Sequence, residues 1–382
     1  MLKLLACSLV IYFSYLGFMM LYFELKTRGD NYFSLPLADR RRLRETIRKH
    51  GRFIYPFFVL VSKVFRMPTP PLMRYKGVTG PLMMASKKSY KFTKNYQPQS
   101  NDIFVATQMK CGTTWMQQVV FEILHRGKGD LSDEGYRHMY ALSPWIETTP
   151  NCSVPFERAP LVGEKNSRII KTHMPAKLCP YNEKAKYIYV TRHPVSCFAS
   201  CIDFIHLLAG PAAPNRENML KWFCSDEMFW LSWPDHVEGW WRRAEQHQNV
   251  LFVHYESMKK DLPSAVKKVA KFLEMDLSAE EIDKVVQRSS FEYMREHEEH
   301  FSMFSPNVFS ESLKTVRFMQ AGTVDRYKDV SDEESKHILD FCHTRLEGGH
   351  YPLDKYYPDG NALPDEIDDA VEANVEKMNN VI

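Results

Sequence analysis

The sequence predicts an α/β fold with a central parallel sheet flanked by helices, and three observations support this prediction. Short runs of β-branched or aromatic residues alternate with longer helical stretches, which is typical of parallel sheets covered on both faces. Polar loops containing glycine or proline follow several of these runs. The chain has 382 residues, 44% hydrophobic and 25% charged, which suffices for one large core.

The expected elements follow one another in a regular order. The four expected strands are Ile103–Ala106, Arg168–Lys171, Tyr187–Thr191 and Val250–His254. The helical stretches among and after them are Thr113–Arg126, Pro194–Leu208 and Pro263–Leu273. Ligands of open parallel sheets bind outside the carboxyl ends of the strands. The loops after the four runs are therefore the candidate site.

Residues 1–70 differ from the rest of the chain, and we expect them to attach the protein to a membrane. They contain 12 Lys/Arg against 4 Asp/Glu. Leu4–Phe23 is a run of 20 uncharged residues, long enough to cross a hydrocarbon core of about 30 Å as a helix. No small-residue cleavage site follows it, which favours a retained anchor over a signal peptide. A core helix of the soluble domain is the alternative.

The flanks of this run predict its orientation. Only Lys3 precedes it, whereas six Lys/Arg follow closely, so the rest of the chain is expected on the cytoplasmic side. A second apolar run, Phe53–Phe65, is interrupted by Pro56 and is too short to span. We expect it in the membrane interface, at the entrance to the site, or in the core. Because the basic charge adjoins apolar sequence, a membrane rather than a nucleic acid is the expected partner.

The remaining boundaries follow from composition. The proline-rich stretch 66–71 separates residues 1–70 from a main domain, 71–358. Residues 359–382 hold seven Asp/Glu and one Lys, which predicts a solvated acidic extension. The eight cysteines show no metal-ligand spacing and no carboxylate cluster is evident, so we expect thiols in a reducing compartment and no metal.

The loop after the first expected strand has the residues of an anion site. Gly112 lets the backbone approach a ligand, and the amide groups of the helix that begins there point at it. Lys110, Thr113 and Thr114 add a charge and two hydroxyl donors. The GxxxxGK[ST] spacing is absent, which argues against a nucleoside triphosphatase or an ordinary kinase. An ordinary capped helix would give a similar pattern.

Two further loops place polar side chains at strand ends. Lys171 and His173 follow the second expected strand, and Pro175 prevents the ladder from continuing. Arg192 follows the third, and Ser200 lies eight residues later on a helix, so a guanidinium and a hydroxyl can hold a second anion. Taken one at a time, these residues could equally be a structural histidine and a surface Arg–Ser pair.

In combination, these segments resemble the donor site of the cytosolic-type sulfotransferases. The matching patterns are Lys-x-Gly-Thr-Thr-Trp, Lys-Thr-His-x-Pro, and Arg-x-Pro with its serine, in this order. Further matches include Pro144-Trp145-Ile146-Glu147, Ser232-Trp233, Tyr255-Glu256-Ser257 and Ser289-Ser290-Phe291. The resemblance covers roughly Asn101 to Lys328.

The resemblance implies a P-loop-like sulfotransferase fold, a donor, 3′-phosphoadenosine 5′-phosphosulfate, and roles for single residues. His173 would be the general base, and Lys110 and Lys171 would stabilise charge on the transferring group. Arg192 and Ser200 would hold the 3′-phosphate of the donor. The full set of implied donor-binding residues is Lys110, Cys111, Gly112, Thr113, Thr114, Trp115, Arg192, Ser200, Tyr255, Ser289, Phe291 and Gly322.

The acceptor side is less determined. Trp145 and Phe204 match apolar walls of the family's acceptor pocket. With the expected anchor, this favours transfer of a sulfuryl group to the hydroxyl or amine of a small lipophilic alcohol, phenol, sterol or amine. Two alternatives stay open: a catalytically inactive, membrane-tethered nucleotide-binding relative, and a nucleotide-dependent kinase.

Three departures from the family's pattern bear on these expectations. Gln320-Ala321-Gly322 stands where the family has Arg-Lys-Gly, so two positive charges are missing unless Arg317 or Arg326 replaces them. The family's short dimerisation motif is not evident, which leaves the oligomeric state open. Cys111 replaces the commoner serine, and it would place a thiol at a helix amino terminus, where thiolates are favoured.

Overall fold

The central feature of the computed structural model is a sheet of four parallel strands in the order β4-β3-β5-β6. The structure describes residues 2–64, 66–133, 135–150, 152–303, 319, 322 and 325–357. The strands are β3 (Asp102–Thr107), β4 (Arg168–Thr172), β5 (Lys186–Thr191) and β6 (Val250–His254). Each contains one of the four expected runs, and their pairing is parallel throughout. The predicted α/β fold is confirmed.

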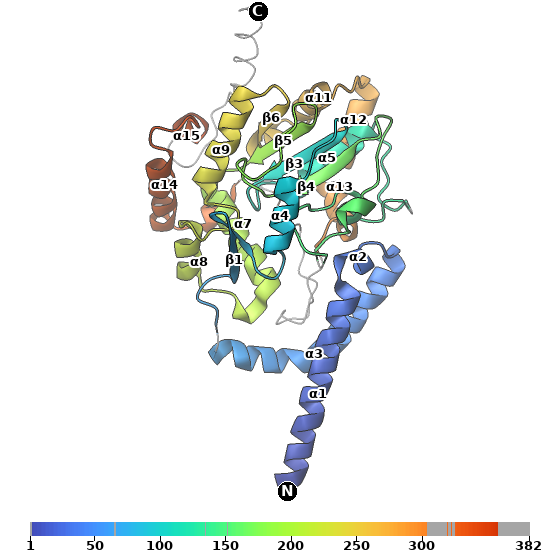
Figure 1. Cartoon of the computed structure of the whole chain (residues 1–382), viewed down its shortest axis with the longest axis vertical. Coiled ribbons are helices and arrows are strands. Elements are labelled where there is room, and N and C mark those ends of the chain that lie inside the picture. Colours follow the sequence, from blue (N-terminus) through green and yellow to red (C-terminus); the bar gives the residue numbers. More distant parts are fainter. Residues whose placement is uncertain are drawn as a thin grey trace, which may run out of the picture.

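Alternate residues of the strands enter two separate cores, because successive side chains of a strand point to opposite faces. Phe104 and Ala106 of β3 pack with residues of α7 and α9, whereas Ile103 and Val105 pack with residues of α5, α11 and α12. Figure 1 shows these helices around the sheet. Their bounds are α5 (Thr113–Leu124), α7 (Pro194–Ala209), α9 (Trp233–Gln246), α11 (Leu262–Phe272) and α12 (Ala279–Arg288).

Smaller elements surround this framework. A β-hairpin that the sequence reading missed joins β1 (Leu72–Tyr75) to β2 (Val78–Pro81), and positive φ angles at Lys76 and Gly77 form its tight turn. The remaining helices of the domain are α4 (Lys87–Asn95), α6 (Met139–Leu142), α8 (Arg216–Phe223), α10 (Tyr255–Lys260), α13 (Phe291–Glu296), α14 (Asp332–Leu346) and α15 (Leu353–Tyr356). Single 3₁₀ turns include η2 (Gly210–Ala212), η3 (Glu298–His300) and η5 (Asp325–Asp329).

A helical hairpin precedes the domain and projects from it (Figure 1). It consists of α1 (Leu2–Thr27), the short α2 (Gly29–Tyr32) and α3 (Leu37–Val64). The first part of α3 lies beside α1: Tyr15 Oη and His50 Nδ1 are 2.6 Å apart, and Tyr12 Oη donates to the carbonyl of Phe53 at 3.1 Å. Beyond this contact α3 turns and runs across the end of the domain (Figure 1). Pro56 lies near the turn, where it removes a helical hydrogen bond.

Two findings refine the expectations for residues 1–70. The second apolar run is not a separate segment, since α3 begins at Leu37 and extends through it to Val64. The expected span Leu4–Phe23 is helical, but its second half is paired with α3. Among the described residues, the helix long and apolar enough to cross a membrane is Pro194–Ala212, whose window is 44% buried, and Val10–Met19 is a shorter apolar stretch. Pro194–Ala212 contains α7, so we assign it to the core.

Candidate active site

A cavity of about 650 Å³ opens at the carboxyl ends of the strands. It brings together residues from many segments that are distant in the sequence. The residues identified from the sequence that line it are Lys110, Gly112, Thr113, Thr114, Trp115, Trp145, Lys171, His173, Arg192, Ser200, Phe204, Tyr255, Phe291 and Gly322. Two others, Cys111 and Ser289, are buried outside the lining.

The loop between β3 and α5 is held in a conformation that few residues adopt. Gly112 has φ +100°, and a Cβ atom there would lie 2.8 Å from Cδ2 of Tyr255. Lys110 also has a positive φ, 66°. The side chain of Gln108 holds the loop in place, because its amide nitrogen donates to the carbonyls of Phe229 and Leu231 at 2.8 and 2.7 Å. The loop thus turns the backbone amides at the start of α5 toward the cavity.

His173 is oriented by the residue that ends β3. Its Nδ1 lies 2.8 Å from the carbonyl oxygen of Thr107, and this contact fixes the tautomer with hydrogen on Nδ1. Nε2 then carries the lone pair. Burial is the main reason why the pKa of His173 lies well below its ordinary value, and the charge of Lys171 adds to this effect. The imidazole is therefore neutral near pH 7 and able to accept a proton at Nε2.

A buried carboxylate holds the backbone and the wall around His173. Glu147 accepts hydrogen bonds from His173 N at 2.5 Å, Trp145 Nε1 at 2.6 Å and Thr172 Oγ1 at 2.9 Å. Burial raises the pKa of Glu147 to about 6, and the three donors limit this rise. From the sequence, Glu147 stands out only as part of a matching motif. Its acceptor role follows from the bridge between Trp145 and Lys171, which places Glu147 beside the end of β4 and which no local pattern encodes.

Two lysines carry the positive charge of the inner cavity. Lys171 Nζ lies 3.9 Å above the Trp145 ring and 3.2 Å from Tyr140 Oη. Burial lowers its pKa to about 7, although Glu147 opposes the shift. Lys110 Nζ lies 4.7 Å from the centre of the Phe204 ring, and loss of water lowers the pKa of this lysine as well. Both ammonium groups would gain from an anion placed between them.

A second group of side chains is suited to an anion and an aromatic base. Arg192, which is 6% exposed, donates to Ser200 Oγ at 2.9 Å and stacks on the Tyr255 ring at 4.6 Å. The ring centres of Trp115 and Tyr255 are 5.3 Å apart, and Trp115 Nε1 donates to the carbonyl of Ser289 at 2.7 Å. Within the described chain, Ser289 Oγ is buried without a hydrogen-bond partner.

The expectations for Cys111 and for Arg326 have different outcomes. Cys111 is fully buried, and its Sγ lies 3.8 Å from Cys197 Sγ rather than in the cavity. Burial raises the pKa of this thiol well above its usual value, so the expectation of a favoured thiolate is wrong. Arg326 does line the cavity, but it is paired with Asp203 at 2.6 Å and with Asp329 at 2.7 Å. Arg317, Gln320 and Ala321 lie outside the described residues.

The inner end of the cavity carries two lysines, one arginine and a neutral imidazole. Among the described residues, no group of three or more His, Cys, Asp or Glu side chains could hold a metal ion. The fold and the groups at the inner end are those of a transferase that handles an anionic group on a nucleotide.

Comparison with known proteins narrows this class to a family. A family model described as the sulfotransferase domain matches residues 100–349, so the chain belongs to this family and is a sulfotransferase. Human sulfotransferase 1C2 is 29% identical over 67% of this chain and 87% of its own length. The amine sulfotransferase of Oryctolagus cuniculus is 29% identical over 70% of this chain and 88% of its own length.

Solved structures confirm the fold. Mouse sulfotransferase SULT7A1 complexed with PAP has a TM-score of 0.56 and 21% identity, covering 81% of this chain and 99% of its own. Retinol dehydratase in a complex with retinol and PAP has a TM-score of 0.58 and 21% identity, covering 77% and 96%. The family's donor, 3′-phosphoadenosine 5′-phosphosulfate, fits the residues present here. The unpartnered Ser289 hydroxyl, the stacked Arg192 and the backbone cradle at Gly112 are the features that carry this fit.

Proposed function

We propose that this chain moves a sulfuryl group from 3′-phosphoadenosine 5′-phosphosulfate to the hydroxyl or amine of a small lipophilic acceptor, at a membrane surface. One observation carries the catalytic part. His173 Nδ1 is committed to the Thr107 carbonyl, which leaves the basic Nε2 at the inner end of a cavity that also holds Lys110 and Lys171.

The residues act on protons and charge. The donor supplies a sulfuryl group already activated for transfer. His173 Nε2 removes the proton of the acceptor as its oxygen or nitrogen attacks sulfur. The bond from sulfur to the 5′-phosphate oxygen breaks in the same step, and adenosine 3′,5′-bisphosphate leaves. Lys110 and Lys171 stabilise the negative charge that develops on the oxygens around sulfur, in a site where burial strengthens this interaction. Arg192 and Ser200 hold the 3′-phosphate, and Trp115, Tyr255 and Phe291 surround the adenine.

The acceptor class follows from the walls of the cavity. Its lining is largely apolar and includes Met67, Met83, Met84, Ile205, Leu208 and Phe229. Apolar walls with a few polar groups at one end favour a lipophilic molecule with a single reactive head. Two relatives named for their acceptors, the guinea pig 3-alpha-hydroxysteroid sulfotransferase and the rabbit amine sulfotransferase, support this class.

Membrane attachment through residues 1–70 completes the proposal. Several apolar side chains of α1 are exposed, among them Val10, Phe13 and Phe18, and the basic residues that follow favour a cytoplasmic position for the catalytic domain. Protease protection in sealed vesicles tests the orientation. Cleavage of the domain only after the vesicles are opened would contradict it.

Two measurements on the full-length protein test the enzymatic proposal. Calorimetry should detect binding of adenosine 3′,5′-bisphosphate but not of ATP, whereas the reverse would indicate a kinase. Transfer of labelled sulfate to a panel of alcohols, phenols, sterols and amines should yield a labelled product. Tight binding of the bisphosphate without transfer to any acceptor would instead indicate a nucleotide-binding relative that has lost catalysis.

A further inference from the structure

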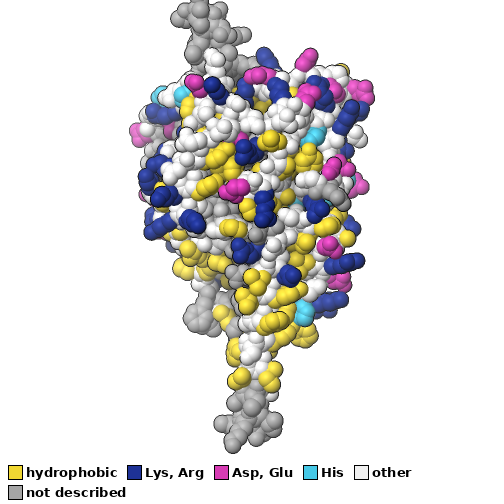
Figure 2. Space-filling model, turned by 45° about the vertical axis from the view of Figure 1, so that its right-hand side comes forward, with side chains coloured by type: hydrophobic (Ala, Val, Ile, Leu, Met, Phe, Trp, Pro, Cys, Tyr) yellow, Lys and Arg dark blue, Asp and Glu magenta, His cyan; other side chains and the backbone are white. Residues whose placement is uncertain are grey.

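The exposed apolar side chains of this protein are concentrated at one end. Thirteen large hydrophobic side chains of the described residues are exposed. Ten of them belong to the hairpin or to the segment just after β2: Val10, Ile11, Phe13, Phe18, Leu21, Leu25, Phe53, Leu60, Leu82 and Met83. Figure 2 shows apolar side chains gathered toward the end of the molecule from which α1 projects. A patch of this kind marks a surface that is covered by something other than water.

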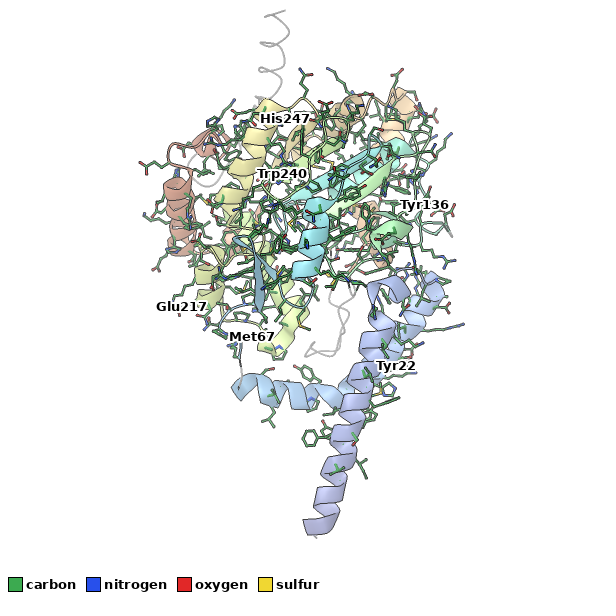
Figure 3. The ribbon with its side chains drawn as sticks, viewed as in Figure 1. Tyr22, Met67, Tyr136, Glu217, Trp240 and His247 are labelled. Carbon is green, nitrogen blue, oxygen red and sulfur yellow. The ribbon has the colours of Figure 1, made fainter. Side chains whose placement is uncertain are left out.

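The mouth of the active-site cavity lies in this patch. Met83 lines the cavity and is 76% exposed. Met67 also lines it and follows the end of α3, and its backbone N donates to the carbonyl of Ala212 at 3.3 Å. Figure 3 shows Met67 on the side of the domain that faces the second part of α3. Arg66 Nε donates to the carbonyl of Ala213 at 3.1 Å, so α3 is attached to the rim of the cavity.

The geometry of the hairpin also limits how deeply it could insert into a bilayer. The residues of α1 before Tyr12 extend beyond the point where α3 turns away (Figure 1). A helix of residues 2–12 is about 16 Å long at roughly 1.5 Å per residue, which is about half of a hydrocarbon core of about 30 Å. Lys49 and Arg52 of α3 lie next to His50 and Phe53, which contact Tyr15 and Tyr12, so deeper insertion would carry cations into hydrocarbon. The geometry therefore favours insertion into one leaflet.

The charge beside the apolar patch matches an anionic lipid surface. On the first part of α3 the side chains of Arg41, Arg42 and Lys49 are 62%, 81% and 71% exposed, and each lies beside one carboxylate. Arg48 and Arg52 of the same helix are exposed as well, so basic side chains outnumber acidic ones on this surface. Basic side chains near the surface of a membrane are attracted to anionic headgroups. An apolar partner protein would have no need of this basic flank. We therefore take the bilayer as the occupant of the patch.

We propose that the cavity opens onto the lipid bilayer, so that the enzyme takes its acceptor from the membrane and not from water. This inference rests on the proposed function. The cavity is apolar at the rim, at Met67 and Met83, and polar at its inner end, at Lys171 and His173. A bilayer-dissolved amphiphile enters with its hydroxyl or amine first and leaves its tail at the rim. The acceptor class is thereby narrowed to membrane lipids or sterols with one such head.

The test compares two acceptors with the same reacting group, 4-hexadecylphenol and 4-methylphenol. Full-length protein is bound to vesicles of phosphatidylcholine and phosphatidylserine, and labelled sulfate transfer is measured at increasing lipid and constant total acceptor. Transfer to the long-chain phenol should fall in proportion to its dilution in the lipid, and transfer to 4-methylphenol should stay constant. A long-chain rate that does not respond to lipid dilution would overturn the inference.

Substitutions on the patch sharpen this test. Leu60→Glu should raise the apparent KM for the long-chain phenol about tenfold, because a carboxylate would replace an apolar side chain at the surface that is expected to face hydrocarbon. The KM for 4-methylphenol should stay within about twofold. Leu161→Glu is the matched control, since Leu161 is 49% exposed and lies outside the lining of the cavity.

The outcomes separate the inference from the function on which it rests. Equal effects of Leu60→Glu on both phenols, or no effect on either, would contradict entry from the bilayer while leaving sulfate transfer intact. A stable dimer that does not float with vesicles would show that a second copy covers the patch. Failure to bind adenosine 3′,5′-bisphosphate would instead contradict the proposed function itself.

Discussion

The active-site cavity buries its cations, whereas the N-terminal hairpin leaves most of its described cations exposed. Lys171 and Arg192 are only 4% and 6% exposed in the cavity, whereas the side chains of Arg42 and Lys49 on α3 are 81% and 71% exposed. Removing a cation from water is costly unless an anion or hydrogen-bond acceptors compensate. The buried cations therefore indicate a binding site for a charged ligand. The exposed ones require no such ligand and are suited to a charged surface.

The apolar residues show the reverse distribution. In the domain they fill two cores on either side of the sheet, but on α1 and α3 several remain exposed, although Leu16, Met19 and Ile47 are buried between the two helices. The domain therefore buries most of its apolar side chains by itself. The exposed apolar side chains of the hairpin need a membrane or another apolar surface to cover them.

The largest expected effect is on the base of the cavity. His173→Ala should lower kcat by about 10³-fold, because proton removal by a positioned imidazole contributes about 10²–10⁴-fold. Binding of adenosine 3′,5′-bisphosphate, measured by calorimetry, should be retained. His247→Ala, at the end of the domain remote from the hairpin (Figure 3), is the control. A parallel loss of nucleotide binding would indicate that His173 supports the structure and is not the base.

The next effect concerns the buried charge. Lys171→Met should lower kcat by about 10²-fold, since one preorganised charge is removed from the transferring group. The pKa of Lys171 is about 7 in the protein without ligand, and a bound dianion should raise it. Nucleotide binding at pH 8 should therefore take up roughly one proton, detectable by calorimetry in buffers of different ionisation enthalpy. The exposed Lys177→Met should leave this uptake unchanged, and uptake that persists in Lys171→Met would contradict the assignment.

A third prediction concerns the carboxylate behind the base. The pKa of Glu147 is raised from 4.5 to about 6, so folding favours the protonated form, and this stabilisation is lost as pH rises from 4.5 through 6. The free energy of unfolding of Glu147→Gln minus that of the wild type should increase by about 2 kcal/mol from pH 4 to pH 7. Urea titrations at both values measure the difference. The exposed Glu157→Gln should show no such trend, and a constant difference for Glu147→Gln would rule out the shift.

The smallest effect is expected where the hairpin meets the domain. Arg40 is 1% exposed and donates to the carbonyls of Glu299 at 2.6 Å and Arg137 at 2.7 Å. Arg40→Met should weaken this attachment by about 1.5 kcal/mol, the lower range for hydrogen bonds of charged groups. Trypsin cleavage after Arg66 should then accelerate about tenfold. Arg42→Met, on an exposed position, should have no effect, and equal acceleration by both variants would refute the role of Arg40.

Much of the fold was predictable because its signals are local. The four strands and the helices α5, α7 and α11 follow from short runs of apolar residues, whose side chains enter a core on each face of the sheet. Lys110, His173 and Arg192 could be singled out because each directly follows a strand, and parallel strands end at one edge.

Tertiary packing decided the rest. That the Thr107 carbonyl fixes the tautomer of His173 depends on the register between β3 and β4. That Glu147 holds the backbone of His173 depends on the bridge between Trp145 and Lys171. Cys111 follows Lys110 in the loop, yet its side chain turns to Cys197 because neighbouring residues of a tight loop point in different directions. The pairing of α1 with α3 likewise depends on contacts such as Tyr12 with Phe53, between residues 41 positions apart. The sequence by itself determined the strands, the loops and the chemical groups they carry, because those depend on neighbouring residues. Protonation states, the orientation of the loop side chains and the course of α3 were decided only by long-range contacts.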